Sequence, residues 1–146
     1  MDMPSVNRTE TPWMIVALHR PPFCSNPRDG IDKELAQTWH PLFVKYEFDF
    51  VMTGHVHYYE RMCAVENNTA CSTTRDRPIY IADGTAGAEF SPASGTPKDA
   101  ITEYKDFSKW GYSRFFVTDE SLNFTHYHVD NSVADSVALP RKRHRK

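Results

Sequence analysis

Two short apolar runs, residues 13–18 and 48–53, each end abruptly where histidines follow, and this pairing constrains the fold more than any other feature. The first run leads into His19, and the second is followed by His55 and His57. Short apolar runs rich in β-branched and aromatic residues predict buried strands. Two histidines that are two residues apart in an extended chain lie on the same face, so the second strand should present a histidine pair at its end.

A helix is predicted between these two strands, because apolar residues recur there at helical spacing. The residues of this stripe are Leu35, Trp39, Leu42, Phe43 and Tyr46. Strand, helix and strand with short connections make a βαβ unit, in which the strands are parallel. Pro41 lies inside the stripe and should divide it, with one helix ending near residue 37 and another starting near Pro41.

The carboxyl ends of parallel strands meet at one edge of a sheet, where α/β proteins place their sites. His19, His55 and His57 should therefore meet there. Neutral imidazole is the commonest side-chain metal ligand near neutral pH, and Gly54 in front of the pair would let the backbone turn closely around an ion. A His-x-His triplet alone is more often part of an ordinary strand. What favours a metal site is the additional histidine, His19, at the end of the first strand.

The residues around these histidines resemble a known family. Val16–His19 resembles the V-x-x-H motif of the calcineurin-like binuclear metallophosphoesterases, and Gly54–His57 resembles their G-H-x-H motif. The continuation Tyr58–Arg61 resembles the purple acid phosphatases, as do residues 77–87 and 111–116. The resemblance implies an α/β (α+β) fold, the C-terminal half of a four-layer αββα sandwich, with a βαβ unit followed by mostly antiparallel strands.

The same resemblance implies an acid phosphatase that hydrolyses phosphoric monoesters at a binuclear centre of Fe(III) with Zn, Mn or Fe(II). It assigns His19 and His55 to the divalent ion and His57 to the ferric ion. After the first strand, the loop 20–30 should form a wall of the substrate pocket. Arg28 in this loop stands near the position where plant relatives bind phosphate and could hold a phosphate oxygen, although an exposed turn arginine is an equal alternative.

The chain departs from the family in lacking its first three metal motifs, since it has no Gly-Asp pair and no Asn-His pair. Two dications about 3.5 Å apart repel by roughly 19 kcal/mol at an effective dielectric constant of 20, and neutral imidazoles bring no compensating charge. We therefore expect an incomplete centre, at most one weakly held ion and no hydrolysis from this chain alone, with the N-terminal half of the catalytic domain as its missing partner. The alternative is a non-catalytic fragment or binding module of the same fold. An all-β cupin, which also has His-x-His before a glutamate, does not suit the βαβ pattern.

The length of 146 residues fits one domain at most. We expect a flexible segment over 1–12, a partial catalytic domain over 13–130 and a basic tail over 131–146, solvated and disordered rather than a nuclear-import or polyanion patch. Residues 141–146 hold five of the 17 basic residues, so the rest of the chain has 12 basic against 19 acidic residues. An acidic body argues against nucleic-acid binding, and the longest apolar runs are too short for a membrane span.

Cysteines and glycosylation sequons indicate the compartment. Cys63 and Cys71 bracket a short polar loop and could form a disulfide, which leaves Cys24 over. A disulfide and several sequons together favour an oxidising compartment, so we expect a secreted or extracellular/vacuolar protein. The start of the chain has neither the basic nor the apolar region of a signal peptide, so we expect that signal on an upstream segment. The sequon asparagines are Asn7, Asn67 and Asn123.

Residues 110–118 and 122–129 predict a β-hairpin near the C-terminus. Alternation places Phe124, His126 and His128 on one face of its second strand. These two histidines form another His-x-His, but no strand-end glycine precedes them and no family motif includes them. We interpret them as ordinary strand histidines.

Overall fold

The computed structural model describes residues 3–26, 32–67, 70–74, 76–92 and 100–142. Within this part of the chain no helix is both long and apolar enough to cross a membrane. The elements, in chain order, are η1 (Met3–Ser5), β1 (Ile15–Leu18), α1 (Lys33–Lys45), β2 (Phe50–Thr53), β3 (Tyr59–Asn67), β4 (Ala70–Cys71), β5 (Ile79–Asp83), β6 (Thr102–Asp106), β7 (Gly111–Val117), β8 (Ser121–His128) and β9 (Val133–Pro140).

The predicted βαβ unit is confirmed. β1 and β2 pair in parallel, from Ile15 opposite Phe50 to Leu18 opposite Thr53. β5 pairs in parallel with the other side of β2, and β3 then runs antiparallel to β5. β4 and β6 both pair with β3, which completes a six-stranded mixed sheet. The carboxyl ends of β1, β2 and β5 therefore share one edge.

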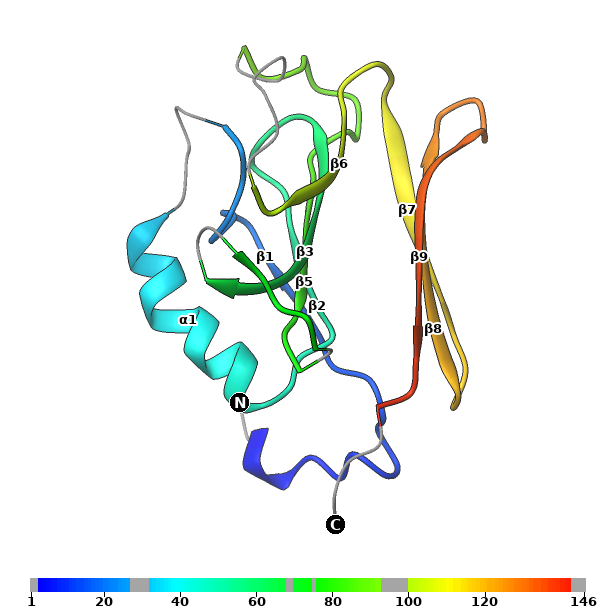
Figure 1. Cartoon of the computed structure of the whole chain (residues 1–146). Coiled ribbons are helices and arrows are strands. Elements are labelled where there is room, and N and C mark those ends of the chain that lie inside the picture. The colour runs from blue at the N-terminus through cyan, green and yellow to red at the C-terminus, as the bar shows by residue number, and fades with distance from the viewer. Residues whose placement is uncertain (1–2, 27–31, 68–69, 75, 93–99, 143–146) are drawn as a thin grey trace.

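Three layers follow from the alternation of side chains along the strands. Helix α1 covers one face of the mixed sheet, and the three-stranded sheet β7-β8-β9 covers the other (Figure 1). Along β2, Val51 joins the core beneath α1, whereas Phe50 joins the core between the sheets. Along β5, Tyr80 and Ile81 divide in the same way. This arrangement is the expected carboxyl-terminal part of an αββα sandwich.

Helix α1 is continuous, so the predicted division at Pro41 is wrong. Proline removes one backbone donor, which leaves the carbonyl of Gln37 without its helical partner. Both residues lie on the exposed face of the helix, where that carbonyl can bind water. Ala36 and Phe43, on the buried face, anchor the helix on both sides of the proline.

Residues 131–140 are not part of a tail. Val133–Pro140 forms β9, which pairs along β8 from Ser121 opposite Pro140 to Tyr127 opposite Val133. Leu139 is buried in the core between the sheets, and Val137 packs against that core. The prediction of a tail over 131–146 was based on the basic residues after residue 140 and missed this strand.

The segments at both ends of the described chain converge on one buried carboxylate. The Asp49 side chain is fully buried and lies 3.2 Å from an Arg8 guanidinium nitrogen and 3.1 Å from Lys142 Nζ. Arg141 also donates to the carbonyl of Thr9 at 2.7 Å. A buried carboxylate needs such partners, and through Arg8 it ties the N-terminal segment to the sheet.

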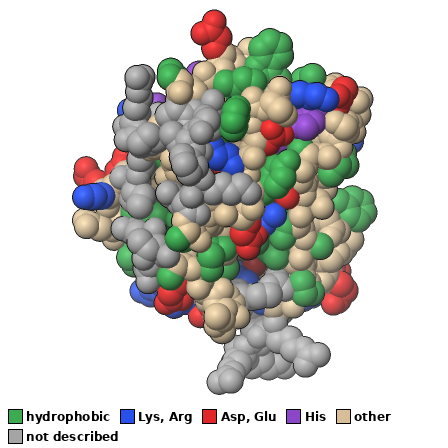
Figure 2. Space-filling view, turned by 45° about the horizontal axis from the view of Figure 1, so that its top comes forward, with side chains coloured by type: hydrophobic (Ala, Val, Ile, Leu, Met, Phe, Trp, Pro, Cys, Tyr) green, Lys and Arg blue, Asp and Glu red, His purple; other side chains and the backbone are tan. Residues whose placement is uncertain are grey.

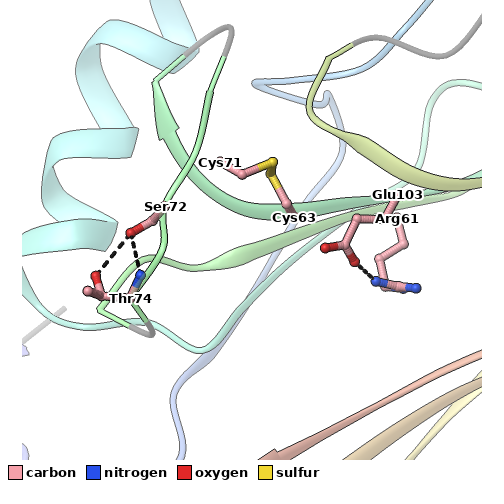
Figure 3. Close-up of a disulfide and its surroundings, with 6 residues drawn as sticks. All are labelled: Arg61, Cys63, Cys71, Ser72, Thr74 and Glu103. Carbon is pink, nitrogen blue, oxygen red and sulfur yellow. Dashed lines mark hydrogen bonds and ion pairs between the residues drawn. A yellow bond between two sulfur atoms is a disulfide. The ribbon is translucent and has the colours of Figure 1, made fainter.

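The C-terminal hairpin and a disulfide complete the fold. β7 and β8 pair from Gly111 opposite His128 to Val117 opposite Leu122, which confirms the predicted hairpin. Cys63 and Cys71 are joined by a disulfide with Cα atoms 5.7 Å apart, beside the Ser72–Thr74 turn (Figure 3). In the chain-entropy model a loop this short contributes roughly 2–3 kcal/mol to stability.

Candidate metal centre

The ends of β1 and β2 bring two histidines together. His19 follows β1 directly, and the backbone N–H of Gly54 donates to the His19 carbonyl at 3.1 Å, which extends the parallel pairing by one step. His55 then places its Nδ1 atom 3.1 Å from His19 Nε2, with the ring centroids 5.0 Å apart. Figure 2 turns the upper side of the view in Figure 1 forward, and histidine side chains are among those that reach this face of the molecule.

The His55–His57 segment is a bent loop and not the extended strand end that the sequence suggested. His55 has a φ of 65°, in the left-handed region, and Gly54 does not. Val56, between the two histidines, is buried completely. The turn that the glycine was expected to make is therefore made by His55 itself. A non-glycine residue in this conformation is strained and is common at functional sites.

His57 is held apart from the His19–His55 pair by its own set of contacts. Its Nδ1 lies 2.8 Å from the carbonyl oxygen of Glu89, and its backbone N–H donates to Ser91 Oγ at 2.8 Å. In the described residues no group of three or more His, Cys, Asp or Glu side chains is placed to hold one ion. The structure thus brings His19 and His55 together, and the third predicted ligand, His57, lies on the same loop as His55.

The two paired imidazoles fit one divalent metal ion. Histidine nitrogens bind zinc at about 2.0–2.1 Å, so two of them on a tetrahedral ion lie about 3.3 Å apart. The observed separation of 3.1 Å is close to this value. Without an ion, the same nitrogens can share a proton as donor and acceptor. His19 and His55 would therefore supply two ligands, and the rest would come from outside the described part of the chain.

The loop after β5 packs closely against the segment His55–Tyr58. A Cβ atom on Gly84 would lie 2.0 Å from the carbonyl oxygen of Val56, so only glycine permits this close approach. Gly84 also donates its N–H to the Tyr58 carbonyl at 3.1 Å. A side chain at position 84 would displace the backbone of Val56, which lies between His55 and His57.

Tyr58, Tyr59 and Glu60, in the stretch Tyr58–Arg61 that resembles the family, are fully buried. Glu60 is fully buried and accepts hydrogen bonds from the Ser25 N–H at 2.9 Å and from the Tyr58 hydroxyl at 3.1 Å. It thereby ties the loop after β1 to β3. Burial, followed by the nearby Glu60 carboxylate, raises the pKa of Tyr58, so the phenol stays protonated and donates.

The histidines of β8 link the two sheets. His126 is fully buried, stacks on Tyr59 with ring centroids 4.0 Å apart, and faces the Asp83 carboxylate at 3.5 Å. Burial acts to raise the pKa of Asp83, but hydrogen bonds from His126 and Ser113 outweigh it, and the pKa lies below its usual value. His128 pairs with Asp106 at 2.6 Å. Both histidines sit in a strand, as predicted, and each contacts an aspartate of the mixed sheet.

The remaining sequence-predicted residues are placed as follows. Arg28 lies outside the described residues. Asn7 is exposed in a turn in which its Oδ1 accepts from the Thr9 N–H at 3.1 Å. Asn123 lies on the central strand β8, opposite Phe116 and Ala138. Asn67 ends β3, and Cys24 is buried and takes no part in the disulfide.

A mixed sheet between a helix and a second sheet, with histidines at its parallel edge, is the arrangement expected of the metallophosphoesterase class of fold. Comparison with solved structures supports this. Purple acid phosphatase from yellow lupin (Lupinus luteus) superposes with a TM-score of 0.81 over 95% of this chain and 27% of its own, at 24% identity.

Sequence comparisons narrow the class. Residues 77–136 match the family model described as iron/zinc purple acid phosphatase-like protein C. The probable inactive purple acid phosphatase 9 of Arabidopsis thaliana is 31% identical over 94% of this chain and 23% of its own length. The Fe(3+)-Zn(2+) purple acid phosphatase 12 of the same plant is 41% identical over 59% of this chain and 20% of its own length.

The chain is thus a relative of the purple acid phosphatases and corresponds to the carboxyl-terminal part of their catalytic domain. It spans less than a third of the length of these curated relatives.

Proposed function

We propose that this chain supplies the histidine side of a binuclear metal centre that hydrolyses phosphoric monoesters. The observation that carries the proposal is the 3.1 Å approach of His19 Nε2 and His55 Nδ1 at the parallel edge of the sheet. His19 and His55 would hold a divalent ion (Zn, Mn or Fe(II)), and His57 would hold Fe(III). When bound, such a pair of ions supplies positive charge to the phosphate and activates a water for attack.

What this chain's own residues do is fix the imidazoles. The left-handed backbone of His55 turns its ring toward His19, and the buried Val56 separates the two ligands of the loop. The Glu89 carbonyl can only accept a hydrogen bond, so Nδ1 of His57 carries the proton and Nε2 keeps its lone pair for an ion. Arg28 remains a candidate for binding a phosphate oxygen.

The test is to compare the chain alone with a chimera. In the chimera this chain replaces the matching carboxyl-terminal part of the A. thaliana Fe(3+)-Zn(2+) enzyme. With iron plus zinc or manganese, the chimera should release p-nitrophenol from p-nitrophenyl phosphate at acidic pH, and the chain alone should release none. Elemental analysis of both proteins gives the metal content. Metal-dependent turnover by the chain alone would contradict the requirement for a second half.

A non-catalytic role is the second candidate. It is favoured by the relative named probable inactive, which is 31% identical over 94% of this chain. A chimera that folds, binds no more than one ion and hydrolyses nothing would support this alternative and contradict the enzyme.

We also propose a secreted or extracellular/vacuolar location. The Cys63–Cys71 disulfide and the exposed turn at Asn7 support it. When the chain is made in a eukaryotic secretory host, peptide mass spectrometry should show the disulfide and N-linked sugar at Asn7 and Asn123. Asn7→Gln and Asn123→Gln should each remove one sugar. A secreted product that carries sugar at neither Asn7 nor Asn123 would contradict this proposal.

A further inference from the structure

One short segment, residues 85–91, closes around His57, and we refer to it as the His57 clamp. It contacts the histidine three times. Ser91 Oγ accepts the His57 backbone N–H at 2.8 Å, the Ser91 N–H donates to the His57 carbonyl at 3.1 Å, and the Glu89 carbonyl lies 2.8 Å from Nδ1 of the ring. The orientation and the tautomer of the His57 ring therefore depend on where the clamp holds the Glu89 carbonyl.

The clamp itself is exposed and irregular. Residues 86–89 are exposed to solvent, and Gly87 has a φ of 109°. A segment of this kind has little packing of its own and opens readily unless something fixes it. The position of the Glu89 carbonyl must therefore come from contacts with more rigid elements.

The start of the second sheet provides two such contacts. The Gly111 N–H donates to the Thr85 carbonyl at 3.0 Å. Immediately before it, the indole Nε1–H of Trp110 donates to the Ala88 carbonyl at 2.9 Å, one residue away from Glu89. Trp110 is itself fixed, because its carbonyl accepts the Val129 N–H from the end of β8 at 3.0 Å.

We propose that Trp110 is a positioning residue for His57. Its indole N–H ties the Ala88 carbonyl to the three-stranded sheet, and this keeps the next carbonyl in place to hold His57 in the Nδ1–H tautomer, with Nε2 directed away from the clamp. The role of Nε2 as a metal ligand rests on the proposed function; the control of the tautomer by Trp110 does not. Burial does not account for a tryptophan at this position, since the residue is 47% exposed.

The variant that tests this is Trp110→Phe, which keeps an aromatic ring and removes the indole N–H. In the full chain labelled with ¹⁵N-histidine, at a pH where the imidazoles are neutral, long-range ¹H–¹⁵N spectra report which ring nitrogen of His57 carries the proton. The parent chain should show the Nδ1–H form. Trp110→Phe should shift both ¹⁵N resonances toward a mixture of tautomers.

The matched control is Trp39→Phe, because Trp39 is 40% exposed on α1 and stacks on Phe43, within the same helix. It should leave the His57 resonances unchanged. In the chimera, Trp110→Phe should lower kcat about threefold to tenfold, less than the 10–100-fold expected for direct partners of ligands. An unchanged His57 tautomer in a folded Trp110→Phe chain would overturn the inference. A shifted tautomer supports it even if the chimera hydrolyses nothing, an outcome that would count against the proposed function alone.

Discussion

Replacing His55 in the chimera should abolish phosphatase activity while the fold survives. His55→Asn removes the imidazole that faces His19, and asparagine tolerates the left-handed backbone that this position requires. Loss of a residue that merely supports a ligand costs 10–100-fold, so loss of the ligand itself should lower kcat/KM at least about a hundredfold. The measurements are steady-state hydrolysis of p-nitrophenyl phosphate and metal content after dialysis.

Two further variants separate the ligand role from backbone strain. His55→Ala should be as inactive as His55→Asn but less stable, because alanine is disfavoured at a positive φ. His40→Gln alters a histidine that contacts Tyr80, away from the sheet edge, and should leave kcat/KM at the parental value. Unchanged turnover in His55→Asn would contradict the assignment of this imidazole to a metal.

The sequence predicted the parallel pairing and the meeting of His19 with His55, because both depend on strand periodicity and on the edge that parallel strands share. It did not predict where His57 points. That direction depends on the left-handed φ of His55 and on the Glu89 carbonyl, more than thirty residues further along the chain. No local pattern encodes a contact of that range. Trp110 and Gly111, at the start of β7, hold the segment that carries the Glu89 carbonyl, and nothing in the sequence connects them with His57.

The division of the chain at residue 130 failed for a different reason. The basic residues after Pro140 suggested a solvated tail, and the alternating residues of β9 were included in it. Asp135, in the middle of that strand, is the partner of two residues from the Tyr58–Arg61 motif. A largely buried arginine needs a carboxylate partner, so Arg61 itself implies an acidic residue elsewhere in the fold.

Removing Asp135 should destabilise the chain by several kcal/mol. Arg61 Nε lies 2.7 Å and an Arg61 terminal nitrogen 3.0 Å from the two Asp135 oxygens, and Tyr59 donates its hydroxyl to the same carboxylate at 2.7 Å. Burial, and then the Asp135 charge, raise the pKa of Tyr59, so the phenol keeps the proton that it donates. Arg61 also pairs with Glu103 (Figure 3).

The side chains of Arg61 and Asp135 are only 11% and 7% exposed, which makes this pair a buried one. Removing one partner of a buried ion pair costs about 3–5 kcal/mol, and Glu103, whose side chain is 49% exposed, would compensate the remaining Arg61 charge only in part. Asp135→Ala should lower the free energy of unfolding in urea by that amount. Asp130→Ala is the matched control, because its pair with Lys109 is about half exposed at 49% and 50%, and it should change the free energy of unfolding much less than Asp135→Ala.

A double-mutant cycle then separates the pair from its surroundings. If the bidentate contact carries the effect, Arg61→Ala and Asp135→Ala together should cost clearly less than the sum of the two single changes, since the double variant leaves neither charge buried alone. If residues after 130 were a solvated tail, Asp135→Ala would match Asp130→Ala and the cycle would show no coupling. Equal unfolding midpoints for these two variants would therefore contradict both the assignment of β9 to the fold and the structural role of Arg61.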